Sequence, residues 1–128
     1  MFHTTVNSPY SVEETVEKLG EAFQKQEFGV LWDFDAKGKL DEKGVGLDNK
    51  FRILEVCSPK IAKEVLEETM LAGYFLPCKV VVYEENGETK AGMPNPTKLM
   101  EFVDNEKVMK VAEKVEAKME AAMNEAVK

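Results

Sequence analysis

The chain has 128 residues, of which 44% are hydrophobic and 32% are charged. This length fits one domain spanning residues 1–128, and the composition is typical of a globular protein rather than a disordered or fibrous one. Seventeen basic and 24 acidic residues give a net charge of −7. Because phosphate binding requires clustered cations, this charge argues against nucleic acid and anionic membranes as partners.

The N-terminal residues 1–6 lack the basic start and apolar core of a signal peptide. The longest uncharged apolar run, residues 70–78, is far shorter than a membrane span. We therefore expect a cytoplasmic protein, in which Cys57 and Cys78 are free thiols. One histidine and two separated cysteines provide no zinc-ligand spacing, so we expect neither a metal nor a cofactor.

In chain order, the first predicted elements are a strand, a helix and a second strand. Residues 2–7 alternate in polarity, as a short strand does. Ser11 begins a helix and forms a capping box with Glu14. The apolar stripe of this helix has spacings of four, three and four, and it consists of Val12, Val16, Leu19 and Phe23. We expect Phe28-Gly29 to close the helix, with glycine in the left-handed turn, and residues 30–35 to form a strand.

The middle of the chain predicts a third strand followed by a second helix. Residues 36–49 are polar and rich in glycine, with at most one short helix around residues 39–43. Residues 51–57 form the strand. Ser58-Pro59 begins the helix, because serine caps helices and proline suits the first helical position. This helix runs to about Leu71, and its predicted buried residues are Ile61, Val65, Leu66 and Met70.

The last third of the chain predicts a hairpin and a long helix. Residues 79–84 and 89–93 are the two strands, and Asn86-Gly87 is the turn because both positions tolerate a positive φ. From Asp104 onward the buried stripe is Val108, Val111, Val115, Met119, Ala122 and Ala126. The resulting order, β-α-β-β-α-β-β-α, predicts an α+β fold with a curved antiparallel sheet and helices packed on one face.

Two cysteine-centred segments resemble a known family. They are Ile53–Pro59 and Leu76–Tyr83, supported by Gly29-Val30-Leu31 and the Asn86-Gly87 hairpin. Over nearly its whole length the chain resembles the bacterial and archaeal family of domain of unknown function 302. The resemblance implies a fold similar to the TATA-box-binding-protein-like class, but no function, because none is established for the family. Nor does the fold class imply DNA binding, since function depends on sites and the chain has a single arginine, Arg52.

Cys57 is the leading candidate for chemistry. It ends a strand just before a helix, where backbone N–H groups and the helix dipole stabilise an anion and lower the pKa of a thiol. The alternative is a small apolar side chain buried at a tight junction. Cys78 follows Leu76-Pro77 at a strand start, and it is either structural or a partner thiol of Cys57, at a distance that the sequence does not give.

Three further residues are candidates for ligand binding. Glu55 shares the face of Cys57 by strand alternation, so it could orient a ligand or act as a base. The alternative places Glu55 on a solvated sheet face, and its charge would raise the pKa of a nearby thiol. Trp32 and Tyr83 are strand aromatics that pack in the sheet or, on an open face, line a pocket.

The sequence lacks a phosphate loop, a dinucleotide fingerprint, paired histidines and a nucleophile elbow. This favours a non-enzymatic module that binds a small ligand or interacts through a concave, partly apolar sheet face. The alternative is a thiol-dependent protein for redox or sulfur transfer, with Cys57 as nucleophile and Cys78 as its partner.

Self-association is the last expectation. The terminal helix, Asp104 to Val127, is long and has a broad apolar stripe, and the open sheet face also needs cover. Packing the helix on its own sheet covers only one of these surfaces, so we expect a symmetric homodimer. The alternative is a monomer with a polar open face, on which Glu55 and Lys79 point outward.

Overall fold

The computed structural model describes residues 1–128 as an α+β fold built on one sheet. The sheet is antiparallel throughout, in the spatial order β1-β5-β4-β3-β2. Its strands are β1 (His3–Ser8), β2 (Gly29–Asp35), β3 (Phe51–Cys57), β4 (Cys78–Glu85) and β5 (Glu88–Pro94). The predicted fold class is therefore confirmed, whereas the likeness to the TATA-box-binding-protein-like class stays a prediction.

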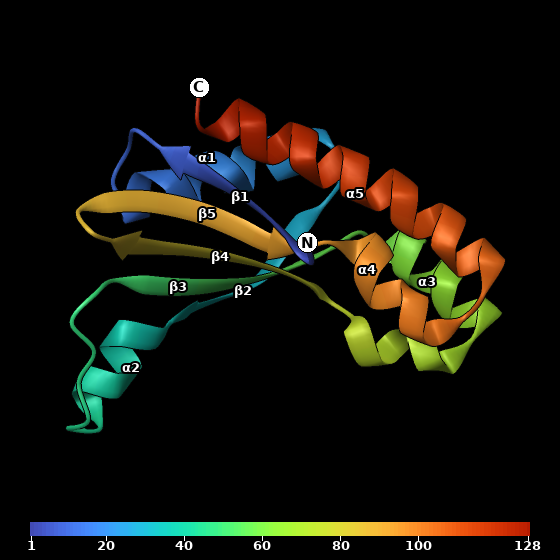
Figure 1. The fold of residues 1–128 in the computed structure, drawn as a ribbon, viewed down its shortest axis with the longest axis horizontal. Coiled ribbons are helices and arrows are strands. Elements are labelled where there is room, and N and C mark those ends of the chain that lie inside the picture. The colour runs from blue at the N-terminus through green and yellow to red at the C-terminus, as the bar shows by residue number, and fades with distance from the viewer.

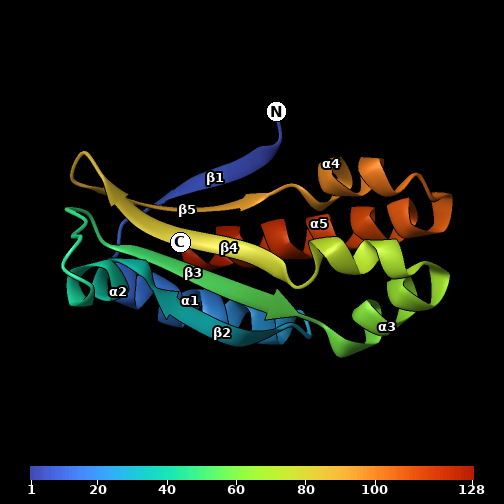
Figure 2. The same cartoon turned by 90° about the horizontal axis from the view of Figure 1, so that it is seen from below.

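The helices lie on one side and at the ends of the sheet (Figure 1). They are α1 (Val12–Lys25), α2 (Ala36–Glu42), α3 (Pro59–Glu68), α4 (Pro96–Met100) and α5 (Glu106–Ala126). Of two short 3-10 segments, η1 (Met70–Phe75) leads from α3 to β4, and η2 (Glu101–Val103) joins α4 to α5. Figure 2 shows α1 and α5 behind the sheet and the strands in front, with no helix across them. None of the helices is long and apolar enough to cross a membrane.

The core lies between the sheet and the pair α1 and α5. Twenty-two buried apolar residues form a single cluster there. In α1 the predicted stripe is buried at Val12, Leu19 and Phe23 and half-buried at Val16. All six predicted stripe positions of α5 are buried. Because α5 packs against α1, α3 and α4, its stripe is covered within the chain and needs no partner.

The predicted capping and turn signals are present where they were expected. The Ser11 hydroxyl accepts a hydrogen bond from the Glu14 N–H at 3.1 Å, which begins α1. Asn86 and Gly87 adopt φ values of 53° and 78° in the turn between β4 and β5. Local side-chain chemistry therefore places these two boundaries, as the sequence indicated.

Two predicted helix ends are wrong. The helix α1 stops at Lys25, and Glu27 takes the left-handed conformation at φ 67°, so that Gly29 already belongs to β2. The helix α3 stops at Glu68 rather than near Leu71, because Thr69 is extended and its hydroxyl accepts from the Leu71 N–H to begin η1. Met70, predicted to be buried, is consequently 76% exposed.

Three helix starts also differ from the prediction. The short helix α2 begins at Ala36, because the Asp35 carboxylate accepts from the Gly38 N–H at 2.9 Å. The sequence prediction contained no α4, which has Pro96 in its first turn. The long helix begins at Glu106 rather than Asp104, since Asp104 is left-handed at φ 55° and Asn105 is the cap.

Candidate functional site

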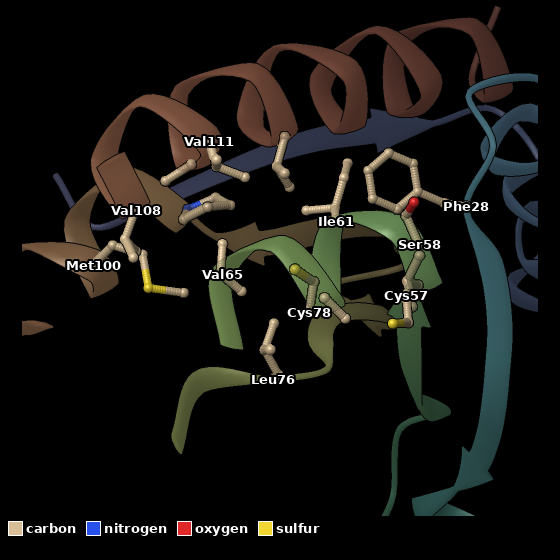
Figure 3. Close-up of a pocket in the computed structure, with 15 residues that line it drawn as sticks. Phe28, Cys57, Ser58, Ile61, Val65, Leu76, Cys78, Met100, Val108 and Val111 are labelled. Atoms are coloured by element: carbon tan, nitrogen blue, oxygen red, sulfur yellow. The ribbon is translucent and has the colours of Figure 1, made fainter. Parts of the chain in front are cut away.

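An apolar cleft lies where β3 ends and β4 begins, next to α3, α4 and α5 (Figure 3). This end cleft consists of two adjoining chambers that share Leu76, Cys78, Pro96 and Met100. The inner chamber has a volume of about 30 Å³, and 13 of its 15 lining residues are hydrophobic. The outer chamber has a volume of about 200 Å³. The inner chamber therefore holds about two water molecules at most, whereas the outer one has room for a small ligand.

The walls of the inner chamber come from several elements. Val65 of α3 is 4% exposed and Met100 of α4 is 6% exposed, and both turn apolar groups inward. Val108 and Val111 of α5 close the opposite side (Figure 3). The inner wall carries no charged side chain, and Ser58 provides its one hydroxyl group. Such a lining favours an apolar occupant.

The walls of the outer chamber come mainly from η1 and from the loops around the sheet end. Tyr74 and Phe75 provide aromatic surface, and Leu99 of α4 adds an aliphatic wall. Lys79 is the one charged residue in this lining, and its ammonium group lies 2.5 Å from the Glu55 carboxylate. The outer chamber is thus mostly apolar, with its single cation already paired.

The two cysteines border the end cleft from opposite faces of the sheet. Cys78 is the cross-strand partner of Val56, which is fully buried against the helices, so both side chains lie on the helix-covered face. Cys57 follows Val56 in β3 and therefore faces the other way. Figure 3 shows the Cys78 sulfur pointing toward Val65 and away from Cys57. Neither cysteine forms a disulfide.

The surroundings of both thiols disfavour the thiolate. Burial raises the pKa of the Cys57 thiol above its usual value. Burial, with smaller effects from the charges of Cys57 and Glu55, raises the pKa of Cys78 to about 11. The position of Cys57 before α3 predicted a lowered pKa, whereas its pKa is raised, because loss of solvent destabilises the charged form of the thiol there.

The other predicted candidates lie on the sheet face that the helices leave uncovered. Glu55 shares this face with Cys57, as strand alternation predicted, and Trp32 is its cross-strand partner in β2. Trp32 stacks on Phe34, with ring centroids 5.1 Å apart. Tyr83 of β4 likewise stacks on its partner in β3, Phe51, at 5.4 Å. None of these residues lines the end cleft, so the structure does not bring them together with Cys78.

Most of the end cleft was not predicted from the sequence. Ile61 and Val65 were predicted as buried helix residues, and the α4 residues Leu99 and Met100 were not placed at all. The one usable signal was Pro96, because proline is common in the first turn of a helix. An apolar cleft wall has the same residue pattern as a core, so periodicity alone does not separate the two.

The structure contains no group of three or more His, Cys, Asp or Glu side chains that could hold a metal ion. The fold and the site therefore define an α+β protein with an open five-stranded sheet and an apolar cleft at the sheet end.

The chain belongs to a family described as a domain of unknown function, DUF302, whose model matches residues 4–126. The crystal structure of an uncharacterized conserved DUF302 protein from Bacillus stearothermophilus is similar over 98% of both chains. The two sequences are 44% identical, and the TM-score is 0.95. A comparison with curated proteins found no match. The predicted family is therefore confirmed, and it brings no activity with it.

Proposed function

We propose that this protein is a non-enzymatic module that binds a small, uncharged, apolar molecule in the end cleft. The observation that carries the proposal is the outer chamber of about 200 Å³, which adjoins a wholly uncharged inner wall. An apolar cavity of about 150 Å³ accommodates a benzene-sized molecule. The outer chamber is larger than that, so a ligand of one ring or of two small fused rings, such as indole, fits it.

The lining indicates how such a ligand would be held. Its flat body would lie against Tyr74, Phe75 and Leu99, where burial of apolar area provides the affinity. Its tip would enter the inner chamber, displacing little or no ordered water because an apolar cavity of this size stays dry. An anionic ligand is disfavoured, because the one cation in the lining, Lys79, is already paired with Glu55.

The raised pKa of Cys78 supports binding rather than thiol chemistry. With a pKa of about 11, Cys78 is neutral near pH 7 and offers the ligand a polarizable, weakly polar surface. Redox or sulfur transfer requires a reactive thiolate. Cys57 also lines the inner chamber, but burial raises its pKa as well, so neither thiol is activated. A binding role also agrees with a cytoplasmic location, where both cysteines stay reduced.

Methyl NMR tests the proposal with indole as the probe. The chain has seven methionines, and Met100 lines both chambers, whereas Met119 is fully buried elsewhere in the core. With carbon-13 in the methionine methyl groups, we expect indole to shift the Met100 signal in a saturable way and to leave the Met119 signal unchanged.

A pair of leucine variants provides the control. Leu99→Trp fills the outer chamber and should abolish the Met100 shift. Leu71→Trp adds the same bulk at a site that is 55% exposed and outside the cleft, so it should retain the shift. No saturable shift at Met100, or one that persists undiminished in Leu99→Trp, would contradict binding at this site.

A further inference from the structure

Figure 2 shows that no helix covers the sheet face opposite α1 and α5. We call it the open face. Strand register places on its middle strands Trp32, Phe34, Phe51, Ile53, Glu55, Lys79, Val81 and Tyr83, and on the rest of it Thr5, Asn7, Glu85, Glu88, Lys90 and Gly92. Trp32 is 55% exposed although it is stacked on Phe34. Phe34, Phe51, Ile53, Val81 and Tyr83 are partly exposed. A contiguous apolar surface of this kind marks an interaction site.

The charges on the open face nearly cancel: two ion pairs leave only Glu88, which register places opposite Glu85, without a salt-bridge partner. The Lys79 ammonium group lies 2.5 Å from the Glu55 carboxylate, and the Lys90 ammonium group lies 3.1 Å from that of Glu85. The whole chain nevertheless carries a net charge of −7. Two copies that met through most other surfaces would bring like charges together. Contact through the open face causes less electrostatic repulsion between the copies.

The area of the open face is comparable with what a stable dimer requires. Five strands of six to eight residues, spaced about 4.8 Å apart with a rise of about 3.4 Å per residue, cover roughly 500 Å² in projection. Side chains project from this plane, so the accessible area is larger than the projected area. It approaches the value of about 800 Å² per partner in a standard interface.

The β2 edge of the sheet is a poorer contact than its face. The edge strand β2 has an exposed Leu31, but the register shifts between Val30 and Trp32. Such a bulge breaks the regular row of backbone groups that an added strand would need. The aromatic pairs, by contrast, lie on the face.

We propose that a second copy of this chain covers the open face in a two-fold symmetric, face-to-face dimer. The same surface then serves both subunits, and its single unpaired carboxylate, Glu88, brings little like charge together. The face also has a shallow hollow lined by Thr5, Val81 and Gly92, in which the Thr5 side chain lies over the glycine. Phe2 and Tyr83 border this hollow, and an aromatic side chain of the second copy would fill it.

Sedimentation equilibrium at micromolar concentrations tests the dimer. We expect a mass of twice 14.4 kDa that falls toward 14.4 kDa on dilution. Trp32 is the only tryptophan in the chain, so its emission should shift to shorter wavelength, and its quenching by acrylamide should decrease, as the dimer forms. A mass of 14.4 kDa at every concentration overturns the proposal and leaves the face to a different partner.

Two variants locate the interface. Trp32→Glu places a charge on the open face of each subunit, and we expect the dimer to weaken by about 100-fold or more. Trp32 is half exposed at an edge strand, so the monomer should stay folded, and circular dichroism checks this. Phe102→Glu, at an 80% exposed aromatic of η2 away from the sheet, should leave the dimer unchanged. Undiminished association of Trp32→Glu overturns the face-to-face dimer.

Discussion

Alkylation of Cys78 should be slow at neutral pH and should accelerate up to about pH 11. Burial disfavours its thiolate and raises its pKa from an ordinary 9.0 to about 11. Below pH 9 the thiolate fraction of any thiol rises about tenfold per pH unit, so a difference of two units leaves about 100-fold fewer thiolates on Cys78. We therefore expect iodoacetamide to modify Cys78 about 100-fold more slowly than an ordinary exposed cysteine.

The variant Cys57→Ser isolates this reaction, because it leaves Cys78 as the only thiol. Mass spectrometry follows the adduct across the pH range, and the same variant unfolded in urea provides the ordinary rate. Reduced access alone would lower the rate without moving its pH midpoint, so the midpoint is the decisive quantity. A rate that reaches its plateau below pH 9 would show a stabilised thiolate. That result would refute our reasoning and favour the redox alternative.

Three other predictions concern stability. Cys78 ionises at a lower pH in the unfolded chain than in the folded protein. The free energy of unfolding should therefore fall between pH 9 and 11, by up to about 3 kcal/mol. Urea titrations should show a smaller fall in Cys78→Ala. Ser11→Ala removes a capping hydrogen bond and should cost about 1 kcal/mol, whereas Ser58→Ala should cost less, because Ser58 makes no side-chain capping bond. Met119→Ala leaves a cavity at a fully buried site and should lower the free energy of unfolding by about 3 kcal/mol. Phe102→Ala, at an exposed site, should leave the free energy of unfolding almost unchanged.

The parts of the fold that the sequence predicted are those specified by local chemistry. The strand 51–57 was placed with its observed bounds, because β-branched and apolar residues there end at Ser58-Pro59. The turn at Asn86-Gly87 and the start of α1 at Ser11 rest on side chains that act within three residues. Glu27 escaped prediction because a left-handed glutamate, unlike a glycine, has no signature in the sequence.

The candidate site was predicted less well, because it depends on which face of the sheet each strand residue occupies. Alternation correctly paired Glu55 with Cys57, but the covered face was not identified, so Cys78 could not be assigned to the opposite side. The strand order places β4 beside β3 and thereby pairs Cys78 with Val56, so that both cysteines border the end cleft from opposite faces. This order follows from long-range packing, which neither periodicity nor capping encodes.

Ligand binding and self-association should be separable, because each variant changes a residue that belongs to one surface. Leu99 lines only the end cleft and Trp32 lies only on the open face, whereas Lys79 borders both. Leu99→Trp should therefore abolish the indole-dependent shift of Met100 without changing the mass in sedimentation. Trp32→Glu should dissociate the dimer and leave the indole titration unchanged. If either variant altered both measurements, the end cleft and the open face would be one coupled surface, and their assignment to separate roles would be wrong.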